Sequence, residues 1–363
     1  MSKQTVTTTT GIRQPYVKYV PLPEPAFAKE TVSTPVSVEV LFDILRRPRF
    51  ADSDGELYVI ENYIKTLPGI QSDPFGNFWL LIQTTDGADA TTLFSSHLDT
   101  VHKAKATETY KLNIRDTMLT VKDGGVLGAD DGTGIWLMLN LIKAKVPGLY
   151  IFHREEEIGG NGSTFIAKNY TKILEKYNRA IAFDRKGLKD IITHQGGERC
   201  CSDEFASAFA DQLNLTEGFH FAGDDTGSFT DTKNYTLLIP ECTNLAVGYY
   251  DQHTMHETQD LSFATRLANR LIAVDWESLP TVRDKTIVED QWANWADDYK
   301  TNWSSKYSNT DKQEKSAEND NLLLMGDLVM DYPEEVAQIL IDLGYDSYDL
   351  ENAISNYRAP EKS

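Results

Sequence analysis

The spacing of apolar and polar positions predicts helices that alternate with short strands. Helical spacing begins at Val38, stops at Pro48 and resumes over residues 57–67, which predicts two amphipathic helices. Apolar runs short enough to be strands occupy residues 78–82, 92–95, 149–152 and 180–183. Helical spacing returns over residues 134–142, 163–170, 202–213 and 261–274. This alternation predicts an α/β fold with a mostly parallel central sheet and helices on both faces.

The two ends of the chain depart from this pattern. Residues 1–35 are rich in Thr and Pro and are predicted to be a flexible tail. Residues 301–321 are polar and highly charged, which is typical of a linker. Residues 322–363 show spacing for three short helices, and their later part resembles a ubiquitin-associated-type module, which makes this small helical C-terminal extension a candidate for binding a protein partner. Residues 36–300 are therefore expected to form the main domain.

Composition narrows the classes of function. The chain has 363 residues, with 35 Lys+Arg against 55 Asp+Glu, and its formal charge of −20 argues against a nucleic-acid-binding surface. Its three cysteines make no disulfide framework and fit a reducing compartment, so we expect a cytoplasmic location. No apolar run approaches the roughly 20 residues of a membrane span, and the first 35 residues lack a signal peptide's apolar core. We therefore expect neither a nucleic-acid nor a membrane partner.

Five short segments rich in Asp, Glu and His follow predicted strands or precede predicted helices. They occupy residues 96–99, 128–132, 155–159, 183–185 and 253–257. The carboxyl ends of strands in an open α/β sheet border one crevice, so the segments that follow strands are expected to lie close together. Together the five supply two imidazoles and three carboxylates as candidate ligands, with a spare glutamate beside one of them. This is the inventory of a two-zinc hydrolase, which favours an enzyme.

The first two segments each permit a structural as well as a chemical role. His97 and Asp99 are two residues apart at a strand end, so their side chains leave on the same side, and one can bind metal while the other orients it. Asp130 and Asp131 open a helix after a glycine-rich turn. Either could simply cap that helix, whereas in the chemical interpretation one bridges two metal ions and the other caps.

Each of the remaining segments, taken alone, also permits more than one interpretation. Residues 155–157 are three adjacent glutamates, which usually form a solvated charge run, but here they follow a buried strand and precede a glycine-rich turn. Zinc hydrolysis also needs a carboxylate that stays free of the metal to transfer protons, and adjacent glutamates can divide these roles. Asp184 could pair with the basic residues that follow it, and the second imidazole could be His253 or His256.

Taken in order, these motifs resemble those of the co-catalytic zinc exopeptidase clan, which holds the di-zinc aminopeptidases, peptidase T and the carboxypeptidase G group. The shared order is His-x-Asp, Gly-Ala-Asp-Asp, Glu-Glu-x-Gly-x-x-Gly-Ser, Asp and His-Thr-x-x-Glu, over about residues 36–280. The resemblance implies Glu156 as general base, Asp99 as the carboxylate that orients a ligand, and Asp130 as a bridging ligand. The full set of implied metal ligands is His97, Asp130, Glu157, Asp184 and His253.

The spacing within the family motifs selects one residue from each pair of candidate ligands. The family's bridging aspartate lies four residues before a glycine, here Gly134, which selects Asp130 over Asp131. The family's histidine lies four residues before an acidic residue, here Glu257, which selects His253 over His256.

The resemblance also implies an architecture and an activity. Members related to peptidase T carry an inserted lid domain between the fourth and fifth ligands, but only 68 residues separate Asp184 from His253. We therefore expect the lidless, zinc aminopeptidase-like form, with residues 36–300 as the catalytic domain. The implied activity is a metal-dependent exopeptidase, an aminopeptidase in first place, acting on a peptide or small amide substrate with two Zn²⁺ ions that hold a bridging hydroxide. Co²⁺ or Mn²⁺ are alternative metals, and residues 223–228 are expected to border the substrate pocket.

Two alternatives stay open at this point. One is a related di-zinc amide hydrolase, such as a dipeptidase, deacylase or carboxypeptidase, built on the same site. The other is a non-catalytic structural protein that retains the fold.

Overall fold

The computed structural model describes residues 35–87, 90–102, 109–287 and residue 340. The chain divides into two compact units, Met1–Ala293 and Asn294–Ser363, and every element named below belongs to the first. Residues 1–34 of the expected tail and the expected linker, 301–321, lie outside the described residues, as does the expected helical module, 322–363, apart from residue 340. These boundaries stay predictions.

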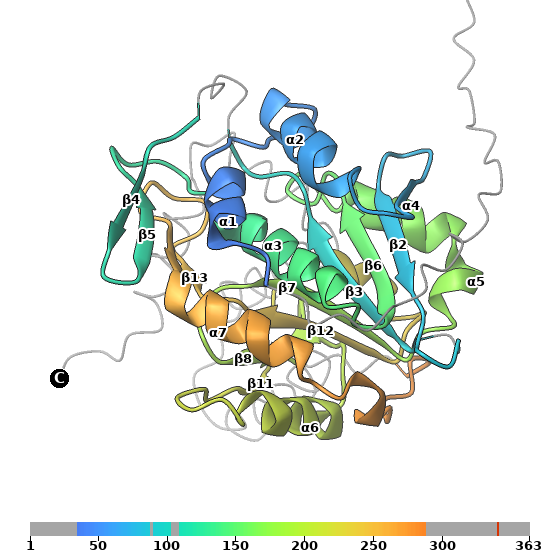
Figure 1. Ribbon diagram of the computed structural model, residues 1–363. Coiled ribbons are helices and arrows are strands. Elements are labelled where there is room, and N and C mark those ends of the chain that lie inside the picture. Colours follow the sequence, from blue (N-terminus) through green and yellow to red (C-terminus); the bar gives the residue numbers. More distant parts are fainter. Residues whose placement is uncertain (1–34, 88–89, 103–108, 288–339, 341–363) are drawn as a thin grey trace, which may run out of the picture. The chain divides into compact units, whose positions relative to one another are not determined.

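An eight-stranded sheet forms the centre of the fold, in the order β1-β2-β6-β3-β7-β12-β8-β11 (Figure 1). Its strands are β1 (Gln71–Ser72), β2 (Phe78–Ile82), β3 (Thr92–His97), β6 (Gly148–His153), β7 (Arg179–Arg185), β8 (Asp190–Ile192), β11 (Ala222–Asp224) and β12 (Glu241–Ala246). The four middle strands β6, β3, β7 and β12 are parallel, which confirms the parallel centre. The β1–β2, β2–β6 and β12–β8 pairs are antiparallel, so the sheet is mixed toward its edges.

The four predicted strands correspond to β2, β3, β6 and β7. Every residue of β2, β3 and β6 is buried. A strand that is covered on both faces has no side exposed to solvent. Its sequence is therefore a continuous apolar run rather than an alternation of apolar and polar residues. The runs end where the chain leaves the sheet, so the polar residues that follow stand at the carboxyl edge of the parallel strands.

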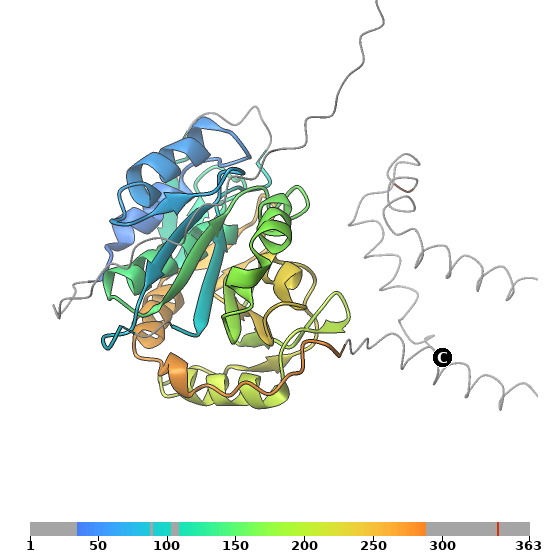
Figure 2. The same ribbon diagram turned by 90° about the vertical axis from the view of Figure 1, so that its right-hand side faces the viewer.

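Helices cover both faces of this sheet (Figure 2). One apolar cluster joins Phe94 and Phe183 of the sheet to α1 (Val38–Leu45), α3 (Ala129–Lys143) and α7 (Leu261–Ile272). It also includes residues of α2 (Asp54–Val59), the π-helical η1 (Ile60–Ile64), α6 (Asp203–Leu213) and the short η3 (Trp276–Ser278). A second cluster joins Leu93 and Leu149 to α4 (Asn161–Asn169), α5 (Thr171–Leu174) and the 3₁₀-helix η2 (Asp231–Tyr235). Neighbours such as Leu93 and Phe94 face opposite sides, as the strand period requires.

Among the described residues, no helix combines the length and apolar character that crossing a membrane requires.

A small antiparallel sheet, which the apolar pattern did not predict, lies beside the central one (Figure 1). It contains β4 (Leu112–Arg115), β5 (Met118–Val121), β14 (Thr258–Asp260) and β13 (Tyr249–Tyr250). Its strands are two to four residues long and β4 is mostly exposed, so no apolar run marks them. Because β13 pairs with β14, the chain between them is held at both ends. A further hairpin pairs β9 (His194–Gln195) with β10 (Glu198–Arg199).

Candidate metal centre

The predicted site residues converge at the carboxyl edge of the central sheet. His97 is the last residue of β3, and Asp184 lies near the end of β7. Asp130 is at the start of α3, Glu157 follows β6, and His253 lies in the connection between β13 and β14. The fold thus brings five segments spread over more than 150 residues of sequence to one place, as expected for the crevice of an open α/β sheet.

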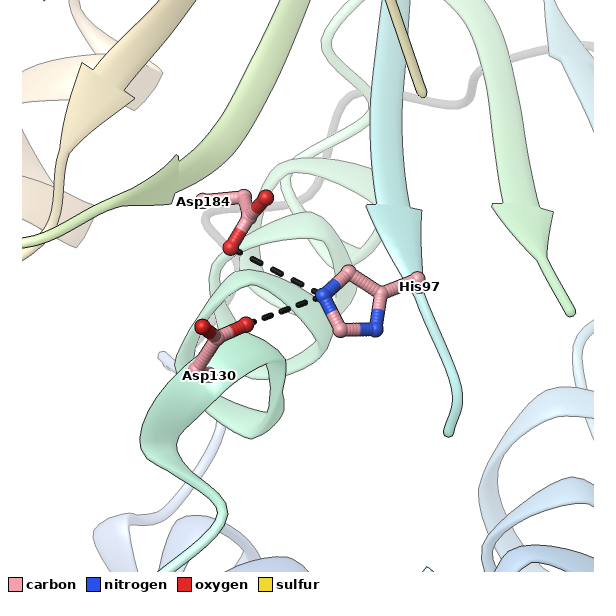
Figure 3. Close-up of side chains that lie close together, drawn as sticks. All are labelled: His97, Asp130 and Asp184. Atoms are coloured by element: carbon pink, nitrogen blue, oxygen red, sulfur yellow. Dashed lines mark hydrogen bonds and ion pairs between the residues drawn. The ribbon is translucent and has the colours of Figure 1, made fainter. Parts of the chain in front are cut away.

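One group of ligand-type atoms surrounds His97. Its Nε2 lies 3.0 Å from Asp130 Oδ1 and 3.7 Å from Asp184 Oδ1 (Figure 3). The three side chains come from β3, α3 and β7 and point toward one another, and their ligand atoms all lie within 4.8 Å of one another. One imidazole and two carboxylates in this arrangement can hold a metal ion.

A second group surrounds His253 and shares Asp130 with the first. His253 Nε2 lies 3.1 Å from Asp130 Oδ2 and 3.2 Å from Glu157 Oε2. Asp130 therefore directs one carboxylate oxygen to each group, which is the geometry required of a bridging ligand. His256, the alternative imidazole, is exposed and belongs to neither group.

The adjacent aspartates have different roles. Asp131 is fully buried, and its carboxylate accepts hydrogen bonds from the backbone N–H of His97, at 3.1 Å, and of Gly134, at 3.0 Å. It is thus a cap for α3 that also fixes the end of β3. Asp130 and Asp131 both have non-helical backbone angles, so their side chains leave the helix start in different directions.

Asp99 connects His97 to the glutamate loop. Its backbone carbonyl lies 3.1 Å from His97 Nδ1, the nitrogen that faces away from the first group, and its Oδ1 lies 3.5 Å from the same nitrogen. Its two carboxylate oxygens also accept hydrogen bonds from the backbone N–H of Glu156 and Glu157 at 3.0 and 3.1 Å. A carboxylate in this place fixes the orientation of the imidazole and the position of both glutamates.

The surroundings of Asp184 contain residues that sequence reasoning missed. Its carboxylate accepts hydrogen bonds from the hydroxyls of Tyr249, at 3.1 Å, and Thr230, at 2.8 Å. The basic residue that follows, Arg185, pairs instead with Asp190 at 3.2 Å. No periodicity or motif marks Thr230, because its position depends on η2 packing against the sheet. Tyr249 lies in the Ala-Val-Gly-Tyr segment before His253, but nothing in that segment indicates its partner.

The acidic groups of the site are strongly perturbed. Burial, together with the charge of Asp184, holds the pKa of Glu156 well above its ordinary value, although His97 opposes the shift. Burial also raises the pKa of Asp184 to about 7, and the charge of Asp130 adds to this. Burial would raise the pKa of Asp130 too, but its contacts with the two histidines lower it. The site therefore concentrates more negative charge than its protein surroundings neutralise.

This excess of negative charge raises the pKa of both histidines. Burial would lower the pKa of His97, but its contacts with Asp130 and Asp184 raise it well above its ordinary value. Burial would likewise lower the pKa of His253, but Asp130 and Glu157 raise it to about 10. A bound cation neutralises the same carboxylates and displaces these protons, as metal ions do when they bind histidine.

The donor set fits divalent metal ions on chemical grounds. Imidazole nitrogens and carboxylate oxygens are the ligand types that zinc binds, and a two-ion site needs a carboxylate shared between the ions. Glu157 gives a further indication, because its Oε1 is buried and has no hydrogen-bond partner among the described residues. An unpartnered buried carboxylate oxygen is costly, and a cation would satisfy it.

A buried arginine connects the segments that lie next to the site residues. Arg49 is fully buried, and its guanidinium donates hydrogen bonds to the backbone carbonyls of Ile44, Leu98 and Gly128. It thereby ties α1, the end of β3 and the turn before Asp130 together. Gly128 has φ +70°, and a Cβ there would lie 3.3 Å from Arg49 Nη1, so the turn needs glycine.

His102 packs beside this turn in its neutral form. Its Nε2 lies 2.9 Å from the carbonyl of Val126 and must donate, so its Nδ1 accepts from the Thr100 hydroxyl at 2.6 Å. Burial and the nearby charge of Arg49 lower the pKa of His102 to about 4. Protonation of His102 is thus disfavoured in the folded state.

This shift predicts an acid-sensitive contribution to stability. A depressed histidine pKa stabilises the fold fully above the unfolded-state value of about 6.5, and the contribution is lost as the pH falls toward 4. At about pH 5 the loss from His102 should be about 2 kcal/mol. Urea unfolding of metal-free protein at about pH 7.5 and about pH 5 measures it. The His102→Gln variant should lose less stability between these conditions, and an unchanged loss would contradict the assignment.

The shared aspartate and both glutamates open onto a pocket. Asp130, Glu156 and Glu157 line it, together with Tyr249 and Phe229. Gly227 and Ser228 also line the pocket, as expected for residues 223–228. The acids of that loop do not line it: Asp224 accepts hydrogen bonds from Thr226 and lies 3.7 Å from Arg185. The carboxylates that line the pocket are therefore those of Glu156 and of the two candidate ligand groups.

Comparison with known proteins gives matches in structure alone. No protein-family model and no curated protein matches the sequence. The aminopeptidase PepT of Bacillus cereus is similar with a TM-score of 0.55 and 14% identity, covering 66% of this chain and 96% of that one. A tripeptidase of Staphylococcus aureus gives 0.54 and 13%, covering 65% and 95%. The aminopeptidase APDkam598 of the archaeon Desulfurococcus kamchatkensis gives 0.53 and 12%, covering 67% and 95%.

These matches establish the fold. The chain shares the α/β architecture of these exopeptidases over about two thirds of its length, which confirms the resemblance inferred from the motifs at the level of the fold. The ligand roles of the individual residues stay predictions.

Proposed function

We propose that this protein is a metal-dependent exopeptidase and, more narrowly, an aminopeptidase. The observation that carries the proposal is the pair of ligand groups that share Asp130, with Glu156 facing the same pocket. A site with two cation positions and a separate carboxylate has the parts that amide hydrolysis requires. The exopeptidase fold of the similar structures supports the same reaction class.

The proposed ligands divide between two ions. His97, Asp130 and Asp184 would hold one, and Asp130, Glu157 and His253 the other. The mixed nitrogen and oxygen donor set favours Zn²⁺, with Co²⁺ or Mn²⁺ as alternatives. When bound, such ions lower the pKa of a water molecule and polarise the carbonyl of the scissile bond.

Glu156 is the proposed general base. Its backbone N–H is held by Asp99, whereas no described residue makes a hydrogen bond or ion pair with its carboxylate. A carboxylate that is positioned but not engaged can take a proton from the attacking water and deliver it to the leaving nitrogen. Its raised pKa, caused by burial, suits a group that must both accept and donate a proton.

We further propose the lidless form of the fold and a cytoplasmic location. Residues 185–252 form β8, β11 and β12 of the central sheet, the β9–β10 hairpin, the helices α6 and η2, and β13 of the small antiparallel sheet. This supports a catalytic domain with no inserted lid. The three cysteines are buried and free, which supports a reducing compartment.

A free substrate N-terminus should be required. The pocket is lined by four carboxylates, those of Asp130, Glu156, Glu157 and Asp184, and by the cationic Arg185 and Lys186. The excess of carboxylates favours an amine over a carboxylate at the end of the substrate. Leaving a buried acid without its amine partner costs about 1–3 kcal/mol, so acetylating the substrate N-terminus should reduce cleavage at least about tenfold. Mass spectrometry of products from matched free and acetylated peptides, with Zn²⁺ added to the full-length protein, measures both the rate and the end that is read.

Different outcomes identify the alternatives. Sequential release of N-terminal residues supports the proposal. Release from the C-terminus would replace it with a carboxypeptidase, and equal cleavage of acetylated peptides with a deacylase or related amide hydrolase. No cleavage of any peptide by the zinc-loaded protein would favour a structural protein that retains the fold.

A further inference from the structure

Glu257 forms an unusual set of contacts at the start of α3. Its side chain is buried, and its carboxylate accepts three backbone N–H hydrogen bonds, from Gly128 at 2.9 Å, Ala129 at 2.7 Å and Asp130 at 3.2 Å. The first N–H groups of a helix have no partners within the helix, and their dipoles favour a negative charge. Glu257 therefore supplies from a distant segment the cap that α3 lacks from its own N-cap residue, Gly128.

The same residue anchors the loop that carries His253. Residues 251–256 of this loop are largely exposed, with the His253 side chain 46% exposed. His253 has φ +66°, a backbone conformation that a non-glycine residue adopts only when its surroundings hold it. Near the end of the loop the Met255 carbonyl accepts from Gly125, and Glu257 is buried against residues 128–130. These contacts fix the distance between His253 and Asp130.

The two ligand groups thus have unequal supports. His97 and Asp184 lie on β3 and β7, neighbouring strands in the middle of the sheet. His253 lies in an exposed loop, held by the short β13–β14 pairing and by Glu257. Loss of the Glu257 contacts should therefore disturb the group that contains His253 more than the group that contains His97.

We propose that Glu257 is a positioning residue. It joins the loop that carries His253 to the turn formed by residues 128–130, and it thereby sets the affinity of the cation position formed by Asp130, Glu157 and His253. This inference rests on the cation set of the proposed function. It assigns Glu257 no contact with substrate or cation: its effect passes through the backbone of residues 128–130 and through the loop.

The chain offers a matched control in Glu241. It is also fully buried, and its carboxylate accepts backbone N–H hydrogen bonds from Ser202, Val282 and Arg283 at 2.7, 2.7 and 2.9 Å. Glu241 begins β12 beside Arg179, the first residue of β7, so it lies at the amino end of the strands, opposite the metal centre. Glu241→Gln therefore removes the same kind of contact with a similar cost to stability but should leave cation binding unchanged.

The experiment is a calorimetric titration of metal-free, full-length protein with ZnCl₂ against a chelator of known affinity. Wild type should bind two Zn²⁺ ions. In Glu257→Gln one of the two dissociation constants should rise about 10–100-fold, the range typical when a partner of a metal ligand is removed. The other should rise less, because both ligand groups contain Asp130 but only one contains His253. Hydrogen exchange of the amides of residues 128–130 in the metal-free variant should also become faster, because their acceptor is weakened. Glu241→Gln should show neither effect.

Each further outcome decides the inference. Unchanged zinc affinities in folded Glu257→Gln, or the same loss in Glu241→Gln, would overturn it. If Glu257→Gln fails to fold, Glu257→Asp retains the charge but shortens the side chain, and it should weaken the same zinc position more than the other. Wild-type protein that binds fewer than two zinc ions would remove the cation set and this inference with it. Failure to cleave peptides despite two bound zinc ions would instead overturn the proposed function and leave the role of Glu257 standing.

Discussion

Glu156→Gln should bind two zinc ions as the wild type does and lose about 10²–10⁴ in the rate of peptide cleavage, the usual contribution of a general base. The reason is that the Glu156 carboxylate lies in the pocket with no hydrogen-bond or ion-pair partner among the described residues, so the change removes proton transfer without removing a ligand. Glutamine has nearly the same shape and cannot accept the proton. Steady-state kinetics together with a zinc titration of the same preparation measure both properties.

The neighbouring Glu155 provides the control. Glu155 does not line the pocket, and its carboxylate accepts a hydrogen bond from the side chain of Asn161 at the surface. Glu155→Gln should therefore keep both zinc binding and activity. If Glu156→Gln were as active as the wild type, the proposed mechanism would be wrong, and if it lost zinc, Glu156 would have to be counted as a ligand.

The sequence predicted the centre of the fold well because the buried strands there are continuous apolar runs. The run 78–82 coincides with β2, and the run 149–152 lies within β6, since a strand covered on both faces must be apolar throughout. For the same reason the site could be located. His97 follows the run 92–95, and Glu156 follows the run 149–152. Parallel strands bring their carboxyl ends to one edge.

The small sheet, the sheet edges and several side-chain contacts show no comparable pattern in the sequence. The strands of the small sheet are two to four residues long, which is too short to show a period, so the apolar pattern marks the helix at residues 261–274 but not β14 before it. The antiparallel edges of the central sheet likewise depend on how strands pair, which the apolar pattern does not encode. Thr230 acts through one hydrogen bond and Glu257 through three, all across long separations in sequence, and only the folded chain shows their partners.

The choice between Asp130 and Asp131 illustrates the limit most clearly. From the residues alone either aspartate could cap the helix or bridge two ions, and only the family spacing favoured Asp130. In the structure the two have separate partners: Asp130 faces both histidines, whereas Asp131 faces two backbone N–H groups. The local backbone, which is non-helical at both residues, makes this separation possible, and local sequence does not specify it.

The two aspartates should therefore differ in their effect on cation binding when each is changed to asparagine. Asp130→Asn removes the shared negative charge between the two ligand groups, so both zinc affinities should fall, by more than the 10–100-fold typical of losing a ligand's hydrogen-bond partner. Asp131→Asn keeps one oxygen for the Gly134 N–H but turns an NH₂ group toward the N–H of His97. It should bind two zinc ions while its metal-free form loses about 1–3 kcal/mol in the free energy of unfolding.

Zinc titration and urea unfolding of both metal-free variants provide the comparison. Asp130→Asn should also lose stability in the absence of metal, because the contacts of its carboxylate with His97 and His253 outweigh burial and lower its pKa, so its charged form stabilises the fold. The zinc affinities, rather than the stabilities, therefore distinguish the two variants. The opposite assignment, with zinc lost from Asp131→Asn and retained in Asp130→Asn, would show that Asp131 is the bridging ligand. In that case the carboxylate that faces two imidazoles would owe its position to the histidines alone, and the two-cation arrangement built on it would have to be abandoned.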